Sequence, residues 1–276
     1  MTGAILGDVI GSPFEFRPRK SKNFEFFLPR FGKVCYCTDD SMMTLAVAGA
    51  ILEAGTEDDE LLRKTVVRYM QEIGRTHIDA GYGGTFFRWL FVEDPRPYNS
   101  FGNGAAMRVS PCAWAAESME DARRLSDIVT GVTHNHPEGM KAARAITDAI
   151  WMARHGSDKE EIREHIRANY YPLNKTLDEI RPSYHFDVTC QGSVPESIQC
   201  FLEADSFEDT VRNAVSLGGD ADTQAAIAGS IAEAYYGIPE ELEQKAEEYI
   251  IEADDYYHLP HDLILIYLAF RNQYCI

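Results

Sequence analysis

Apolar residues recur at the three- and four-residue spacing of an amphipathic helix along most of the chain. Several boundaries carry start or stop signals, such as Pro137, which can begin a helix, and Gly156 and Gly237, which can end one. The predicted helices are 3–10, 42–54, 58–73, 84–91, 105–117, 119–131, 137–155, 158–168, 191–204, 206–217, 221–236, 239–253 and 259–271. The pattern therefore predicts an all-α protein.

Strand signals are weak by comparison. Only 23–28 and 184–189 are candidate strands, and either could be an extended loop. The proline-containing segment 12–37 is expected to be mostly loop, and its part 12–33 is a candidate lid. Since no linker rich in Pro, Gly or Ser divides the chain, we expect one domain over 1–276.

Composition narrows the functional classes. Hydrophobic residues make up 45% of the 276 residues, which favours a packed core over disorder. The net charge of −18 disfavours binding to nucleic acid or to an anionic membrane. The sequence shows neither a secretory signal nor a membrane-spanning apolar run, so a cytoplasmic protein with six reduced cysteines is expected.

Two short acidic clusters carry the strongest chemical signal. Thr38-Asp39-Asp40-Ser41 and Asp220-Ala221-Asp222-Thr223 each stand directly before a long apolar helical stretch. Carboxylate and hydroxyl oxygens suit hard divalent cations such as Mg²⁺ or Mn²⁺ rather than zinc or copper. Together the clusters offer enough ligands for two ions. The alternative is that both clusters are ordinary helix caps, because Thr, Asp and Ser are preferred at helix N-termini.

Two glycine-rich turns also precede predicted helices. They are Gly81-Tyr82-Gly83-Gly84 and Ser100-Phe101-Gly102-Asn103-Gly104. Backbone N–H groups in such turns can bind phosphate oxygens, because glycine permits close approach of a ligand. Neither turn has the sequence of a P-loop or of a dinucleotide-binding fingerprint. The alternative is that these glycines only mark ordinary loops between helices.

Taken in order, these motifs resemble the ADP-ribosylglycohydrolase family, which includes the dinitrogenase reductase-activating glycohydrolase. The matching segments are Gly7-Asp8-x-x-Gly11-x-x-x-Glu15, Thr38-Asp39-Asp40, Gly81-Tyr82-Gly83-Gly84, Gly102-Asn103-Gly104-Ala105-x-Met107-Arg108, Thr133-His134 and Gly219-Asp220-x-Asp222-Thr223. Each segment is short, but their common order over most of the chain makes the resemblance specific.

The resemblance implies a single-domain orthogonal helical bundle with a central cleft that holds two Mg²⁺ or Mn²⁺ ions. The implied metal ligands are Thr38, Asp39, Asp40, Asp220, Asp222 and Thr223. Glu15, Asp39 and Asp222 are the implied catalytic residues, and Glu15 could be either a ligand or a base. The implied substrate-binding residues are Gly83, Ser100, Phe101, Gly102, Asn103, Gly104 and His134. His136 is expected to be structural.

The implied activity is metal-dependent hydrolysis of the bond between ADP-ribose and an acceptor, with ADP-ribosyl-arginine in protein as the first expectation. Serine-linked ADP-ribose, O-acetyl-ADP-ribose and a small guanidine compound stay open as substrates. A non-catalytic ADP-ribose-binding protein on the same scaffold is a further alternative, although all four cluster carboxylates are present. A monomer is favoured over a dimer.

Overall fold

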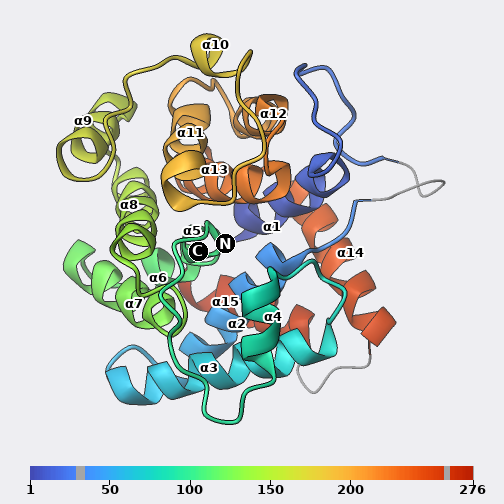
Figure 1. Ribbon diagram of the computed structural model, residues 1–276, viewed down its shortest axis with the longest axis vertical. Coiled ribbons are helices and arrows are strands. Elements are labelled where there is room, and N and C mark those ends of the chain that lie inside the picture. Colours follow the sequence, from blue (N-terminus) through green and yellow to red (C-terminus); the bar gives the residue numbers. More distant parts are fainter. Residues whose placement is uncertain (29–34, 258–261, 276) are drawn as a thin grey trace.

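The computed structural model describes residues 1–28, 35–257 and 262–275, and within these ranges every regular element is helical (Figure 1). The longer helices are α1 (Thr2–Gly11), α2 (Asp39–Ala54), α3 (Asp59–Thr76), α7 (Met119–Gly131), α8 (Pro137–Arg154), α9 (Lys159–Asn169), α11 (Cys190–Leu202), α12 (Phe207–Leu217), α13 (Ala221–Tyr236), α14 (Glu240–Tyr257) and α15 (Leu263–Tyr274). The shorter ones are a 3₁₀ turn η1 (Ser12–Phe14), α4 (Gly84–Leu90), α5 (Gly104–Met107), α6 (Ser110–Ala115) and α10 (Leu177–Ile180). The all-α prediction is confirmed.

Neither candidate strand forms. Residues 23–28 are irregular, with bends at 26 and 27. Residues 184–189 are also irregular, and their only ladder contact in the described chain is an isolated antiparallel bridge between Gly102 and Thr189. Of the proposed lid, residues 29–33 lie outside the described residues. So do residues 259–261 of the last predicted helix, which the structure begins at Leu263.

The prediction of one helix over 105–117 was wrong. The segment divides into α5 and α6, because Pro111 has no N–H to bond the carbonyl of Met107. That carbonyl instead accepts a hydrogen bond from the Thr44 hydroxyl at 3.4 Å. The short helix α10, which the apolar pattern did not predict, begins with a capping box between Thr176 and Glu179.

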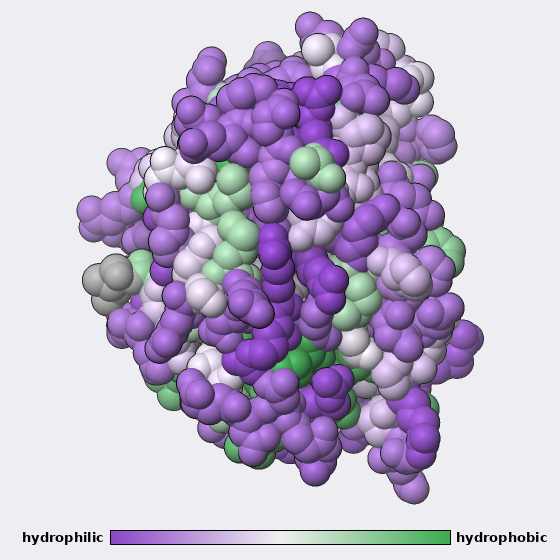
Figure 2. Space-filling model, turned by 90° about the vertical axis from the view of Figure 1, so that its left-hand side faces the viewer, coloured by the Kyte–Doolittle hydropathy of each residue, from purple (hydrophilic) through white to green (hydrophobic). Residues whose placement is uncertain are grey.

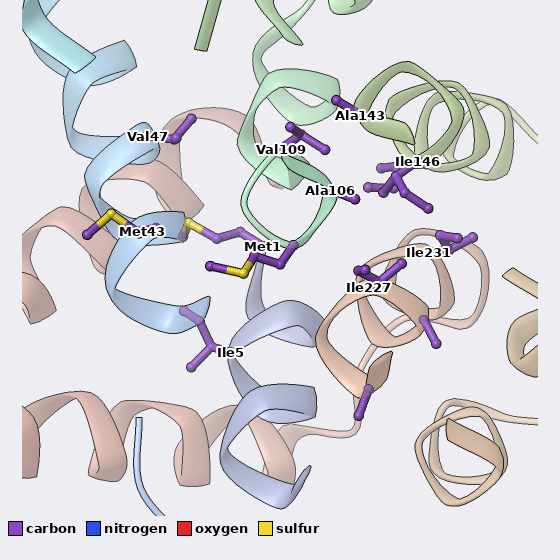
Figure 3. Packing of buried hydrophobic residues seen from close by; sticks show 14 of the residues in the cluster. Met1, Ile5, Met43, Val47, Ala106, Val109, Ala143, Ile146, Ile227 and Ile231 are labelled. Atoms are coloured by element: carbon purple, nitrogen blue, oxygen red, sulfur yellow. The ribbon is translucent and has the colours of Figure 1, made fainter. Parts of the chain in front are cut away.

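Two helices lie at the centre of the core and are buried on all sides. Every residue from Asp40 to Ile51 in α2 and from Ala221 to Glu233 in α13 is buried. A helix without a polar face must be surrounded by other elements. Figure 3 shows side chains from α1, α2, α8 and α13 pointing toward one another in this core, among them Met43, Ile146 and Ile227.

The outer surface is polar, as the net charge suggests. Figure 2 shows a largely hydrophilic face with smaller hydrophobic patches. No helix of the described residues is long and apolar enough to cross a membrane. All six cysteines are unpaired, and five of them are buried.

Helices α1 and α13 run antiparallel at very short distance (Figure 1). Gly3 faces Gly229, Gly7 faces Ala225 and Gly11 faces Ala221 and Asp222, so a Cβ at any of the α1 glycines would overlap the α13 backbone. This contact brings the C-terminus of α1 to the N-terminus of α13. The four-residue glycine spacing therefore serves close helix packing.

We predict that Gly7→Ala destabilises the protein by about 1–3 kcal/mol or more, since the new methyl group must push the two backbones apart. Chemical denaturation followed by circular dichroism measures the change. Gly83→Ala is the matched control, because a Cβ at Gly83 meets nothing within 4 Å. Equal stability of the Gly7 and Gly83 variants would contradict the packing argument.

Candidate active site

The two acidic clusters meet in space. Thr38 to Ser41 stands at the N-terminus of α2, and Asp220 to Thr223 at the N-terminus of α13. The Thr223 hydroxyl donates to Asp40 Oδ2 at 3.1 Å, although the two residues are 183 positions apart in the sequence. All of the cluster residues are buried except Asp39, which is partly exposed. The fold thus brings four carboxylates into one small region.

Asp8 of α1 is a fifth carboxylate here, and the sequence analysis gave it no role. It is fully buried and accepts hydrogen bonds from the Thr38 N–H (2.9 Å), the Thr38 hydroxyl (2.6 Å), the Ser41 N–H (3.0 Å) and the Ser41 hydroxyl. Asp8 therefore fixes the first turn of α2. The signal that could have found it is a lone acid within an apolar, glycine-spaced helix, because a buried charge requires partners.

The carboxylates form two overlapping groups with the spacing of a metal site. Oxygen atoms of Asp8, Asp40 and Asp222 lie within 4.8 Å of one another, and so do those of Glu15, Asp220 and Asp222. Asp222 belongs to both groups. Two neighbouring sites that share one carboxylate would suit a pair of hard divalent cations. Asp39 belongs to neither group.

Helix capping explains only part of this arrangement. Thr38 accepts a hydrogen bond from the Asp40 N–H at 3.4 Å, as an N-cap residue does, but Asp220 makes no capping bond with its side chain. Asp40 Oδ1 is buried without a hydrogen-bond partner. A buried carboxylate oxygen without a donor is costly, and a cation would supply the missing partner.

The electrostatics of the site also favour a cation. Burial, together with the charges of neighbouring carboxylates, raises the pKa values of Asp39, Asp40 and Asp222 well above their usual range. Burial also raises the pKa of Asp220, while a hydrogen bond from Asn103 lowers it. Ionised carboxylates at this spacing repel one another, and a bound divalent ion would reverse that penalty.

A cavity of about 400 Å³ opens beside the carboxylates. One part of its lining is acidic, and another part is formed by the two glycine-rich turns. The predicted site residues in the lining are Glu15, Asp39, Gly83, Ser100, Gly102, Asn103, Gly104, His134, Asp220, Asp222 and Thr223. A Cβ at Gly83 or Gly84 would project into open space, so these glycines leave room for a ligand.

Three predicted residues lie outside the cavity wall. Thr38 and Asp40 are buried behind it, and Phe101 is 42% exposed, with its ring 5.1 Å from that of His136. His136 itself caps α8 by accepting a hydrogen bond from the Glu138 N–H at 3.1 Å, which is the structural role expected of it. Asn103, predicted to bind substrate, donates from Nδ2 to Asp220 Oδ2 at 2.7 Å.

Arg108 is a buried cation in the cavity wall that sequence reasoning also left without a role. Its Nη2 donates to the Thr133 hydroxyl at 2.5 Å and to His134 Nδ1 at 3.2 Å. Burial, followed by the Arg108 charge, lowers the pKa of His134 well below its usual value, so the imidazole is neutral. Because a guanidinium can only donate, Nδ1 accepts and the ring proton lies on Nε2, near Gly104.

Comparison with known proteins identifies the family of the chain. The family model for ADP-ribosylglycohydrolase matches residues 1–272. The chain belongs to the ADP-ribosylglycohydrolase family. Enzymes of this family are glycosidases that act on ADP-ribosyl bonds, so the predicted family and enzyme class are both confirmed.

Two groups of relatives illustrate the range of the family. The chain is 27% identical to the ADP-ribosylhydrolase ARH3 of Mus musculus, over 90% of this chain and 86% of the relative. It is 28% identical to the ADP-ribosylarginine hydrolase Tri1 of Serratia proteamaculans (strain 568), over 86% of this chain and 70% of the relative. The similarity supports hydrolysis of ADP-ribosyl bonds without singling out one linkage.

The fold is also similar to that of a solved structure. An ADP-ribosylglycohydrolase-related protein complex superposes with a TM-score of 0.63 and 24% identity, covering 90% of this chain and 92% of that chain. This likeness supports the all-α bundle of the family.

We predict that Mg²⁺ or Mn²⁺ stabilises the protein by about 3 kcal/mol when the ion is a hundredfold above its dissociation constant. Asp222→Asn should abolish this gain and raise the stability of the metal-free protein, because it removes a charge shared by both carboxylate groups. Thermal unfolding with and without EDTA, together with calorimetric titration of the metal, measures both effects.

Asp94→Asn, at a strongly exposed carboxylate, is the control and should respond to metal like the wild type. Unchanged metal stoichiometry and affinity in the Asp222 variant would rule out the assignment.

Proposed function

We propose that the protein hydrolyses the N-glycosidic bond between ADP-ribose and the guanidinium group of arginine, with two Mg²⁺ or Mn²⁺ ions at its carboxylate cluster. The observation that carries the proposal is the position of Asp222, which belongs to two carboxylate groups and lines the same cavity as Glu15. The family assignment supports the chemistry, and the resemblance of individual motifs supports the residue roles.

In this proposal, Thr38, Asp39, Asp40, Asp220, Asp222 and Thr223 hold the ions. The unpartnered Asp40 Oδ1 and the oxygen-only donor set fit a hard cation. Bound ions of this kind orient ribose hydroxyls and lower the pKa of a nearby water. Asp8 would act through Thr38, which it holds with two hydrogen bonds.

Glu15 is the proposed general base. Its carboxylate belongs to the group with Asp220 and Asp222 and lines the cavity, so it can accept a proton from a water that attacks the ribose anomeric carbon. The bond from that carbon to nitrogen breaks as the bond to the water oxygen forms, through an oxocarbenium-like state. Asp39 and Asp222 would contribute by positioning the reacting groups beside the same cavity.

The glycine-rich turns are the proposed diphosphate site. Gly83, Ser100, Gly102 and Gly104 line the cavity. At Gly83 and Gly84 a Cβ would meet nothing within 4 Å, so a ligand can approach the backbone N–H groups there closely. The Nε2–H of His134 faces the same turn and can donate to a phosphate oxygen. Phe101, at the exposed edge of the turn, is proposed to contact the nucleotide base.

Arginine is the preferred leaving group because relatives named ADP-ribosylarginine hydrolase match at 26% and 28% identity. The name of ARH3 specifies no linkage, so serine-linked ADP-ribose, O-acetyl-ADP-ribose and a small guanidine compound stay open as substrates. A non-catalytic ADP-ribose-binding protein on this scaffold is disfavoured, because all four cluster carboxylates are present.

The first test is hydrolysis of ADP-ribosyl-arginine, ADP-ribosyl-serine and O-acetyl-ADP-ribose side by side, with Mg²⁺, with Mn²⁺ and with EDTA. We expect release of ADP-ribose from the arginine conjugate with metal and none with EDTA. Faster release from another conjugate would reassign the leaving group. Binding of ADP-ribose without any release would favour a binding protein.

A second prediction concerns Glu15. Glu15→Gln should reduce kcat by about 10²–10⁴-fold, because the amide cannot accept the proton, while the affinity for ADP-ribose stays within a few-fold. Steady-state kinetics and calorimetry measure the two effects. Glu25→Gln alters an exposed acid on the same segment and should leave kcat unchanged. Full turnover by the Glu15 variant would remove this residue from the mechanism.

A further inference from the structure

Two exposed phenylalanines lie on segments that contribute to the cavity wall, although neither ring lines the cavity itself. Phe16 directly follows Glu15 and is 77% exposed, and Phe186 is 43% exposed. Their ring centroids are 5.8 Å apart with an interplanar angle of 30°. Phe186 also lies two residues before Val188, which lines the cavity. We call Phe16 and Phe186 the aromatic pair.

Hydrogen bonds link the segments that carry the aromatic pair. Lys20 Nζ donates to the carbonyls of Tyr184 (2.6 Å) and Leu217 (2.5 Å), which links the segment after Phe16 to the segment before Phe186. Asp187 Oδ1 accepts hydrogen bonds from the N–H (2.8 Å) and hydroxyl (2.7 Å) of Thr189. These hydrogen bonds link the two segments, and both rings remain exposed.

The position of the aromatic pair relative to Glu15 indicates which part of a substrate it meets. Glu15 groups with Asp220 and Asp222, where the scissile bond would lie. Phe101 belongs to the turn proposed for the diphosphate, and the segment that follows Phe186 pairs with this turn at the bridge between Gly102 and Thr189. Phe16 directly follows Glu15, so the aromatic pair connects the proposed diphosphate turn with the place where the bond would break. The group released at that place is the part of the substrate that the pair can meet.

We propose that the aromatic pair is a stacking platform for the leaving group and selects a planar guanidinium. The inference rests on the proposed function, because it takes the carboxylate cluster as the place where the glycosidic bond is cleaved. It adds two specificity-determining residues that none of the sequence motifs contains.

Guanidinium is the leaving group that such a surface favours. A delocalised planar cation is attracted to the face of an aromatic ring within about 6 Å of its centroid, and arginine stacks on rings more readily than other side chains. Glu15, which directly precedes Phe16 in the chain, adds a negative charge that would attract the guanidinium. A serine ether or an acetyl ester carries neither a cation nor an extended planar face, so it gains little from the rings.

The test compares kcat/KM for ADP-ribosyl-arginine and ADP-ribosyl-serine in the metal-loaded full chain. Phe16→Leu and Phe186→Leu keep an apolar side chain but remove the ring. Each should reduce kcat/KM for the arginine conjugate by about tenfold and change the value for the serine conjugate less than twofold. Phe91→Leu, at an exposed phenylalanine that follows α4 and contacts Phe87 and Arg75 instead of the aromatic pair, should change neither.

A binding experiment separates this inference from the proposed function. In the Glu15→Gln protein with metal, calorimetry compares the affinities for ADP-ribosyl-arginine and for ADP-ribose. We expect tighter binding of the conjugate, and loss of that preference with Phe186→Leu, whether or not the wild type hydrolyses any substrate. The platform is overturned if the conjugate has no advantage, if the Leu variants keep it, or if both substrates lose kcat/KM equally.

Discussion

The close contact between α1 and α13 is the constraint on which the site depends. Three glycines on one face of α1 let its backbone touch that of α13, and the antiparallel direction then sets Asp8 and Glu15 beside the N-terminus of α13. A wider helix pair, at the usual 8–10 Å between axes, would carry these carboxylates away from Asp222. The glycine pattern of the first helix is thus part of the chemistry, although it contains no reactive group.

The same contact has an electrostatic cost. It gathers four buried carboxylates in one region, those of Asp8, Asp40, Asp220 and Asp222. The hydrogen bonds that the fold supplies satisfy mainly Asp8, and Asp40 Oδ1 has no donor. Proteins keep such unfavourable groups where function requires them. The surrounding core is large and apolar on every side of α2 and α13, so its packing can offset the repulsion until a cation neutralises it. Metal binding and folding stability should consequently be coupled here.

Features set by residues close together in the sequence could be predicted, whereas contacts between residues far apart in the sequence could not. Helices with strong periodicity and caps, and the paired acidic clusters, could be recognised locally. The break at Pro111 could also have been inferred from chemistry, because proline removes a helix hydrogen bond. A lone acid in an apolar helix indicates that Asp8 needs partners, but the partners of Asp8 and Arg108 could not be inferred. They lie at least 25 positions away, and only the fold brings them near. The orientation of Asn103 toward Asp220 is of the same kind.

The residues of the proposed site differ in how easily they can be substituted. The carboxylates project from the ends of fully buried helices, where a substitution would disturb both the core and the charge balance. The aromatic pair lies on irregular segments, and neither ring belongs to the hydrophobic core. Family members that share the chemistry at the ribose can therefore differ in the group they release. Specificity for the leaving group would follow from a few surface side chains, because these alone can vary without altering the buried cluster.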